Sequence, residues 1–445
     1  MSHPKHSLKI LVASMLSALV PTLAQASSFQ ILEQSPAHLG KAFAGTASDI
    51  KDASSVFFNP AGIVKLEGSS VSVGANGIFT NAEFNNRSST INGIEDKTDK
   101  IGFVPNAYLA MPISEQLSFG VAINAPYGLE SDFSNAWIGR YLATHSELAV
   151  VSFNGVLAYE LNEQWSVGVG VDYQRAEVTL ESQVDSTLGV NPMPTTDSRA
   201  KIEGDDDDIA ANVSVLFTPN EQFTLGLVWR QGGKFNLEGD ARFKLNSLCT
   251  AGAGYPTGAP PKPTTGTLCA GALGALAGDA EANVELPDTL TLSASHSLMN
   301  DWKIHADIAW TQWDSIQTIQ VKNTGNNLTI NELALHYDNT VRYALGMSYE
   351  PSGSPWIWRF GVAYDEAPQT NPEFVSVRIP DEDRVWFGAG FNYEFSPALS
   401  VDAGYAYINV QTATIDNTNP QTGRHVSGDF DSHVHIVGVQ ANWKF

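Results

Sequence analysis

The sequence predicts an all-β fold: a 14-stranded antiparallel transmembrane β-barrel with an N-terminal plug in its lumen. Three observations lead to this prediction. Segments of alternating apolar and polar residues recur along the chain, and the connections between them are alternately short and long. The last segment ends on the aromatic residue Phe445, and the chain begins with a secretory signal. A closed barrel leaves no strand edge unpaired, as a bilayer requires.

Residues 1–26 have the three parts of a signal peptide. Lys5 and Lys9 supply positive charge, residues 10–20 are mostly apolar, and Ala24-Gln25-Ala26 is a small-residue cleavage site. The apolar run is shorter than the roughly 20 residues that a membrane-spanning helix needs. We therefore expect the mature protein to begin at Ser27.

Fourteen segments alternate with a period of two, which places one face of each strand on lipid and the other on the lumen. In the last segment, Val437, Val439, Ala441, Trp443 and Phe445 share one face. The segments are 71–79, 103–111, 117–123, 149–159, 165–173, 209–217, 223–229, 290–294, 302–310, 341–349, 358–364, 385–395, 399–407 and 437–445.

The connections sort into two kinds. Turns of a few residues alternate with long polar connections, which are 80–100, 126–147, 180–208, 231–285, 314–338, 365–383 and 408–432. Short turns on one side and long loops on the other are the layout of an outer-membrane barrel. A large periplasmic β-protein has a similar composition but does not sort its loops in this way. We assign residues 67–445 to the barrel and place it in the outer membrane of a Gram-negative bacterium.

Residues 27–66 precede the first strand and do not alternate. They contain small residues and apolar pairs such as Leu39 and Phe43, four positions apart, as on one face of a helix. A barrel of fourteen strands encloses a water-filled lumen unless something fills it. We expect this segment to be the plug.

The plug segment also carries a family resemblance. Ser28-Phe29-Gln30, the run Leu39-Gly40-Lys41-Ala42-Phe43-Ala44-Gly45 and, above all, Asn59-Pro60-Ala61 resemble the hatch of the FadL-type transporters of long-chain fatty acids and hydrocarbons. Asn124-Ala125-Pro126-Tyr127-Gly128-Leu129, Leu286-Pro287 and Ile379-Pro380-Asp381-Glu382-Asp383-Arg384 are similar to further segments of that family. The resemblance covers the whole mature chain.

The resemblance implies a function and a route. It implies uptake of long-chain fatty acids by passive, hatch-gated diffusion, with lateral exit through the barrel wall where the third strand kinks. Phe29 would line an inner pocket under the hatch. Asn59, Pro60 and Ala61 would form a gating turn, for which a simple linker turn is the alternative. Pro126, Tyr127 and Gly128, placed just past the third strand, would mark the lateral opening or merely the start of a loop.

Two long loops contain apolar residues that should be exposed to solvent. Residues 131–143 include Phe133, Trp137 and Ile138 at helical spacing, and residues 267–277 include Leu268 and Leu273. Exposed apolar loops need a reason. We interpret them as a groove that collects lipid; packing of the two loops against each other is the alternative.

A fatty acid carboxylate would be bound by a basic residue, for which arginine is well suited. The candidates are Arg140, Arg175, Arg342 and Arg384, although each is also explained by a structural ion pair. Where the family's carboxylate-binding residues are expected, this chain has Leu180 and Asp338. Neutral aromatic or aliphatic hydrocarbons therefore stay open as the substrate.

Charge and cysteine content limit the partners. Removing residues 1–26, which hold two lysines and no acidic residue, takes the net charge from −23 to about −25. Such a chain is not expected to bind nucleic acid. Cys249 and Cys269 lie in one Gly/Pro/Thr-rich stretch, where an oxidising compartment favours a disulfide over two free thiols. The expected partners are hydrophobic small molecules, outer-membrane lipid and lipopolysaccharide, and the protein is expected to be a monomer.

Other chemistry is sparse, and neither a cofactor nor a metal site is predicted. The run Asp205–Asp208 indicates a solvated rim at the start of a strand, with calcium binding as the alternative. His433 and His435 share a strand face without a third ligand nearby. A lipid hydrolase is the rival class, with His145 beside Ser146 as its weak candidate pair. A nonspecific porin is a third interpretation, which the plug disfavours.

Overall fold

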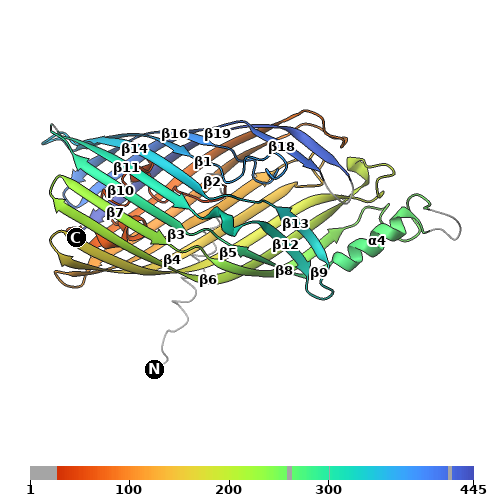
Figure 1. Ribbon diagram of the computed structural model, residues 1–445, viewed down its shortest axis with the longest axis horizontal. Helices are drawn as coiled ribbons and strands as arrows, with labels where there is room; N and C mark the ends of the chain where they lie inside the picture. Colours follow the sequence, from red (N-terminus) through yellow and green to blue (C-terminus); the bar gives the residue numbers. More distant parts are fainter. Residues whose placement is uncertain (1–27, 258–262, 300, 419–422) are drawn as a thin grey trace, which may run out of the picture.

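The protein is described by a computed structural model that covers residues 28–257, 263–299, 301–418 and 423–445. The predicted signal peptide and its cleavage site lie outside the described residues. Fourteen strands form the barrel wall, each antiparallel to the next, and the last pairs with the first to close the ring (Figure 1). The predicted 14-stranded barrel is confirmed. The wall strands are β1 (Ser70–Asn86), β2 (Lys97–Pro112), β3 (Leu117–Asp132), β4 (His145–Asn162), β5 (Trp165–Asp185), β6 (Asp197–Asn220), β7 (Phe223–Arg230), β10 (Thr289–Ser297), β11 (Trp302–Thr311), β14 (Thr340–Tyr349), β15 (Trp356–Asp365), β16 (Arg384–Ser396), β17 (Leu399–Val410) and β19 (His425–Lys444).

Five shorter strands extend the wall at the end away from the C-terminus (Figure 1). They occupy stretches that the sequence pattern assigned to long loops, so those loops are shorter than predicted. Their outer faces are polar, as Asn236, Glu238 and Asp240 of β8 show, so they lack the apolar lipid-facing period of the other strands. The five are β8 (Lys234–Lys244), β9 (Gly278–Glu285), β12 (Thr318–Asn323), β13 (Thr329–Ala334) and β18 (Ala413–Thr418), and helix α4 (Thr265–Leu276) projects beyond them.

Some wall strands also run further than predicted. β3 continues to Asp132, so Pro126, Tyr127 and Gly128 lie within the third strand and not just past it. Asp205–Asp208 lies in the interior of β6 and not at the start of a strand. In β3 the residues after Ile123 are buried in succession, so the period of two is lost, whereas the aspartate run of β6 has no apolar face.

The strands alternate between the lipid side and the lumen. On β1, Val73 and Phe79 are exposed on the outer face, whereas Ile78 points inward and is buried. Aromatic pairs such as Trp165 with Phe217, whose ring centroids are 4.2 Å apart, lie where strands end at the short turns, as in an interfacial girdle. Within the described residues, no helix is long and apolar enough to cross a bilayer.

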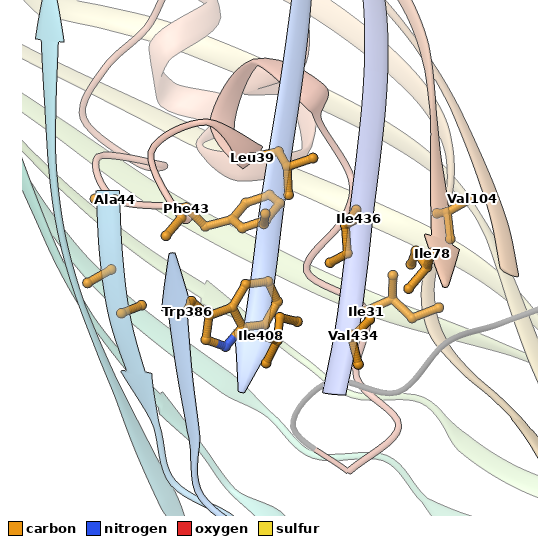
Figure 2. Close-up of a cluster of buried hydrophobic side chains, with 14 of the residues drawn as sticks. Ile31, Leu39, Phe43, Ala44, Ile78, Val104, Trp386, Ile408, Val434 and Ile436 are labelled. Carbon is orange, nitrogen blue, oxygen red and sulfur yellow. The ribbon is translucent and has the colours of Figure 1, made fainter. Parts of the chain in front are cut away.

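Residues 28–66, called the hatch below, lie inside the ring. Their short helices α2 (Pro36–Leu39), α3 (Ser55–Phe58) and η1 (Pro60–Lys65) contact wall strands on opposite sides of the barrel. Figure 2 shows the apolar core that joins hatch to wall, in which Leu39 and Phe43 of the hatch meet inward-facing residues of five strands. The wall residues are Ile78, Val104, Trp386, Ile408, Val434 and Ile436.

Polar contacts hold the hatch as well. Asp307 of β11 accepts hydrogen bonds from the backbone N–H groups of Gly45 (2.6 Å) and Thr46 (3.1 Å). The Tyr108 hydroxyl of β2 donates to the carbonyl oxygen of Gln34 at 2.5 Å. Because buried polar groups are costly without partners, these bonds fix the hatch to the wall in one position.

Glycines in the wall let the hatch backbone approach closely. A Cβ atom at Gly226 of β7 would lie 1.9 Å from the carbonyl oxygen of Ala47. A Cβ atom at Gly361 of β15 would lie 2.1 Å from the carbonyl oxygen of Lys41. Both obstacles are backbone atoms, which cannot rotate out of the way, so hatch and wall fit only because these side chains are absent.

We predict that Gly226→Ala loosens the hatch without unfolding the barrel. The methyl group needs space that the Ala47 carbonyl occupies, so the hatch must shift, while the ladder bonds of β7 are unaffected. Limited proteolysis of the purified protein should cut residues 28–66 at least several-fold faster than in wild type. Barrel stability, followed by heat-dependent mobility on denaturing gels, should stay unchanged.

The matched control is Gly155→Ala on β4, where an added Cβ meets nothing within 4 Å. This variant should be cut at the wild-type rate. Equal cleavage of the hatch in both variants would show that the close approach at Gly226 does not hold it.

Candidate functional site

Two cavities follow one another inside the loop-bearing end of the barrel. The outer one has a volume of about 580 Å³ and is lined by both polar and apolar residues. Tyr141 and Leu142 contribute from one predicted apolar loop, and Leu273 and Leu276 contribute from α4. The two apolar loops therefore face a common space, although of the residues that the sequence singled out only Leu273 is in the described lining.

The inner cavity is narrow and almost wholly apolar, with a volume of about 100 Å³. Aliphatic and aromatic side chains from β4, β5, β8 and β9 line it, among them Val150, Val178, Phe235 and Val284. Phe29 of the hatch forms part of the same lining. Such a space suits an acyl chain or another hydrocarbon and not a hydrated solute.

Four residues line both cavities and so mark their junction: Leu180, Ile202, Asn331 and Arg378. Arg378 is 3% exposed. Its Nη1 donates to the carbonyl oxygen of His145 at 3.0 Å and to Oγ of Ser146 at 2.8 Å. Both Nη1 and Nη2 lie 3.5 Å from the carbonyl oxygen of Glu181.

Arg378 forms no salt bridge with an acidic side chain in the described part of the chain. All of its acceptors are neutral oxygens. Burial alone lowers the pKa of the Arg378 guanidinium to about 10. The group is still cationic at neutral pH, so a buried charge lies at the junction without a counter-charge.

The inner cavity ends at an aromatic cluster around Phe29. The Phe29 ring packs edge-on against Trp313, with centroids 5.0 Å apart, and lies 6.3 Å from the ring of Tyr127. Ile379, the neighbour of Arg378, belongs to the same buried cluster. Phe29 thus separates the inner cavity from the wall residue Tyr127.

The wall has a seam between β2 and β3. These strands pair only from Ala107 with Ile123 down to Pro112 with Ser118. Above that level β3 continues to pair with β4, after a register shift between Asn124 and Tyr127. Pro105 of β2 and Pro126 of β3 lie in the unpaired parts, and proline cannot donate to a ladder.

The hatch takes the place of β2 beside this part of β3. The N–H of Ile31 donates to the carbonyl oxygen of Pro126, and the N–H of Gly128 donates to that of Phe29, each at 2.8 Å. Gln30 and Tyr127 form an antiparallel bridge between these bonds. The Gln34 amide completes the seal, since its Oε1 accepts from the N–H of Ala125 at 3.2 Å and its Nε2 donates to the Ala125 carbonyl at 2.6 Å.

A charged contact closes the upper end of the seam. Lys100 of β2 reaches Glu130 at 2.9 Å and Asp132 at 3.3 Å across the gap. The N–H of Asp132 also donates to Oγ1 of Thr98 at 3.2 Å. The seam is therefore bounded below by a regular ladder, above by an ion pair, and on the inside by the hatch.

The Asn59-Pro60-Ala61 turn anchors the far end of the hatch. Asn59 Nδ2 donates to the Ala47 carbonyl at 2.6 Å, and Asn59 Oδ1 accepts from the N–H of Ala61 at 3.1 Å. The Ala61 N–H also donates to Oγ of Ser214 on β6 at 2.9 Å, and its carbonyl accepts from Ser166 of β5 at 2.7 Å. The turn is therefore more than a linker, because it fastens the hatch to two wall strands.

The capture residues predicted from sequence do not form one groove. Phe133, Trp137 and Ile138 are buried in a core of their own beside Phe84 and Phe430. They lie in turns and not in a helix, because the segment folds back on the wall loops. Leu273 packs on the disulfide and Leu268 is exposed on α4.

Two of the four predicted arginines lie at the loop end in ion pairs. Arg140 is buried, with its Nε 2.7 Å from Oδ2 of Asp197 and its guanidinium stacked over Tyr141. Arg175 lies outside on β5 and contacts three acidic residues, which are Glu177, Asp205 and Asp207. Neither lines the inner cavity.

The other two arginines serve the hatch. Arg342 Nη2 donates to the Ala42 carbonyl at 2.6 Å, and the guanidinium lies over the Trp386 ring. Arg384 pairs with Asp381, whose other oxygen accepts from the N–H of Ser28 at 2.7 Å. All four predicted arginines thus have structural contacts, and those of Arg140, Arg175 and Arg384 are the ion pairs of the alternative explanation.

Arg378 was missed because nothing in its local spacing identifies it as a ligand residue. The available signal was its position, in an otherwise uncharged run, Val375-Ser376-Val377-Arg378-Ile379, directly before the Pro380–Arg384 segment that resembles the family. A charge inside an apolar loop segment indicates a buried cation.

The remaining predicted features have simple explanations. Cys249 and Cys269 form a disulfide that ties α4 to the loop after β8. His145 contacts Asp132 and Glu147 through its ring nitrogens, while Ser146 accepts from Arg378, so the two side chains have different partners. Among the residues described, no cluster of three His, Cys, Asp or Glu side chains has the arrangement of a metal site.

Comparisons with known proteins agree with this geometry. A family model described as outer membrane protein transport protein (OMPP1/FadL/TodX) matches residues 17–445. The chain is 28% identical to a long-chain fatty acid transport protein of Escherichia coli O6:H1 over 454 residues, covering 96% of each chain. It is 25% identical to outer membrane protein P1 of Haemophilus influenzae, covering 95% of this chain and 96% of that one.

Solved structures share the fold. A Pseudomonas aeruginosa FadL homologue superposes with a TM-score of 0.82 at 22% identity, covering 94% of this chain and all of that one. The Pseudomonas putida toluene transporter TodX superposes with a TM-score of 0.70 at 15% identity, covering 93% and 99%. With a family model that spans nearly the whole chain, a closed 14-stranded wall and a segment packed in its lumen, this chain belongs to the FadL-type family of outer-membrane transporters and not to the enzymes.

Proposed function

We propose that this barrel takes up long-chain fatty acids across the outer membrane by passive diffusion, gated by the hatch, with lateral exit between β2 and β3. The seam that the hatch seals carries this proposal. There a luminal segment, Phe29–Ile31, takes ladder bonds on β3 that a wall strand would otherwise make. A segment that both fills the lumen and seals the wall can open a sideways path when it moves.

The energetics of an acyl chain favour such a route. Burial of one methylene is worth roughly 0.8 kcal/mol, so a 16-carbon tail loses on the order of 10 kcal/mol if it must cross water. The inner cavity offers a dry space, and its end at Phe29 lies one ring away from Tyr127 at the seam. A ligand that displaced the Phe29 ring would meet the seam and, beyond it, the lipid.

Neutral hydrocarbons are the second candidate substrate. The inner cavity is lined mainly by aliphatic and aromatic side chains, and this lining alone would accept a neutral chain or ring equally well. One similar structure is that of a toluene transporter. The choice between the two substrate classes therefore rests on polar groups at the cavity's end.

Glu33 gives the hatch a dependence on pH. It is buried three residues from the bridge, its Oε2 has no hydrogen-bond partner among the residues described, and its backbone carbonyl accepts from Asn76 at 2.7 Å. Burial raises the pKa of the Glu33 carboxyl from 4.5 to about 7, against the opposing pull of Arg384 and Arg342. The neutral acid is thus the form that the docked hatch prefers.

Uptake by whole cells tests which substrate the protein transports. A Gram-negative host that lacks its own long-chain fatty acid transporter should take up labelled oleate and grow on it when it produces this protein. The same host with an empty vector should not. Absence of oleate uptake in cells whose outer membrane contains the folded protein would refute the proposal.

A disulfide between the hatch and β3 should lock the seam. Residues of an antiparallel bridge have Cα atoms about 4.5–5.5 Å apart, within disulfide range. The variant Gln30→Cys/Tyr127→Cys should therefore form a disulfide that ties the hatch to β3, and oleate uptake should fall at least tenfold until a reductant restores it. Each single variant serves as a control that reductant should not affect. Uptake that stays normal in the oxidised double variant would exclude exit through this seam.

Ionisation of Glu33 should weaken the docking of the hatch. Because its folded pKa is raised, the stability of the docked hatch is fully present below pH 4.5, falls as pH rises to about 7 and changes no further above it. The full effect is roughly 3 kcal/mol. Amide exchange of residues 28–45, corrected for intrinsic rates, should show less protection at pH 8 than at pH 5. In Glu33→Gln the difference should vanish, and an unchanged difference would assign it to another group.

A further inference from the structure

We propose that Arg378 is the carboxylate-binding residue of this transporter, and that it selects long-chain monocarboxylates over neutral hydrocarbons at the junction of the outer and inner cavities. This inference rests on the proposed function and names the substrate class for the same pathway. It places the head group on a residue outside the four arginines that the sequence singled out and outside the positions of Leu180 and Asp338.

The first ground is the state of the guanidinium. Arg378 is buried, and all of its hydrogen bonds go to two backbone carbonyls and one hydroxyl. Removing a charge from water is expensive unless an opposite charge compensates it. Two of these contacts, both to the Glu181 carbonyl, are 3.5 Å long, at the limit of a hydrogen bond. An incoming carboxylate would replace long neutral contacts with a charge-assisted pair.

The second ground is position. Arg378 lines both cavities, together with Leu180, Ile202 and Asn331. From this junction the inner cavity extends toward Phe29 and offers only apolar surface for a tail. A ligand with its head at Arg378 therefore has its tail in the apolar space, and Leu180 adds apolar contact at the junction.

The third ground is the distribution of charge along the path. Among the residues that the structure describes, Arg378 is the only cation that lines the inner cavity. The acidic residues of that lining are Glu147, Glu203 and Glu281. Glu147 and Glu203 are partly exposed and pair with cations of their own, His145 and Lys201. The three glutamates repel a carboxylate, and Arg378 attracts it.

The other cation near the junction is already engaged. Arg424 lines the outer cavity and pairs with Asp185 there. Arg140, Arg175 and Arg384 have acidic partners. Arg342 contacts the Ala42 carbonyl of the hatch and the Trp386 ring. Of the described cations, only Arg378 combines burial, a neutral set of acceptors and access to both cavities.

The test uses the full-length mature protein, purified in detergent, and two probes with the same tail, labelled oleate and labelled oleyl alcohol. In Arg378→Met, which keeps the length and apolar stem of the side chain, oleate binding should weaken at least tenfold, while oleyl alcohol binding should stay within twofold of wild type. Arg378→Lys should recover part of the oleate affinity, because it restores the charge without the bidentate geometry. Arg175→Met is the matched control and should bind both probes as wild type does.

Each other outcome has one meaning. Unchanged oleate binding in Arg378→Met, with wild type binding oleate, would overturn the head-group assignment and leave the proposed function standing. Equal loss of both probes in Arg378→Met, or no recovery in Arg378→Lys, would show that Arg378 only supports the loop and would also overturn it. Failure of the wild-type protein to bind oleate while it binds oleyl alcohol would refute the fatty acid function itself.

Discussion

The structure depends on the rule that a backbone inside a bilayer must satisfy its own hydrogen bonds. Most of the wall obeys it by strand pairing, but above Ile123 the third strand has lost β2 as its neighbour. The hatch supplies the missing donors and acceptors from inside, through Phe29 to Ile31 and the Gln34 amide. Lumen and wall are therefore sealed by one segment, and any motion that frees the lumen also unseals the wall.

That coupling requires the hatch to be held firmly but not covalently. Backbone-to-backbone approach at Gly226 and Gly361 fits the hatch to the wall without side chains between them. The Asn59-Pro60-Ala61 turn fastens one end to β5 and β6, whereas the bridge at Gln30 fastens the other to β3. Phe29 belongs to the end that seals the wall, so this end is the part that a ligand at Phe29 is placed to displace.

The barrel could be predicted because each lipid-facing residue must be apolar, and that requirement leaves a period of two in the sequence. The plug followed from the lumen of fourteen strands, and Phe29 followed from the resemblance of the N-terminal segment. The loop end could not be predicted in the same way. Strands such as β8 and β12 have apolar residues on the face toward the inner cavity but polar residues on the outer face. They therefore lack the apolar lipid-facing period that identified the other strands. The partner of Arg140 is Asp197, which lies 57 residues away along the chain. Spacing alone also does not show that Arg378 forms no salt bridge with an acidic side chain of the described residues.

The same reasoning explains why an uncompensated charge is tolerated at Arg378. A buried cation costs stability, and pairing it within the chain would have been the cheaper solution, as Arg140 and Asp197 illustrate. An internal carboxylate at the junction would, however, neutralise the one feature that separates an amphipathic anion from a neutral oil in an otherwise apolar path. When the carboxylate of the ligand supplies the missing negative charge, it relieves the destabilisation that the unpaired cation causes in the empty protein. This relief contributes to the free energy of binding. Once the head group is held there, the tail is aligned with the inner cavity, toward Phe29 and the seam that the hatch closes.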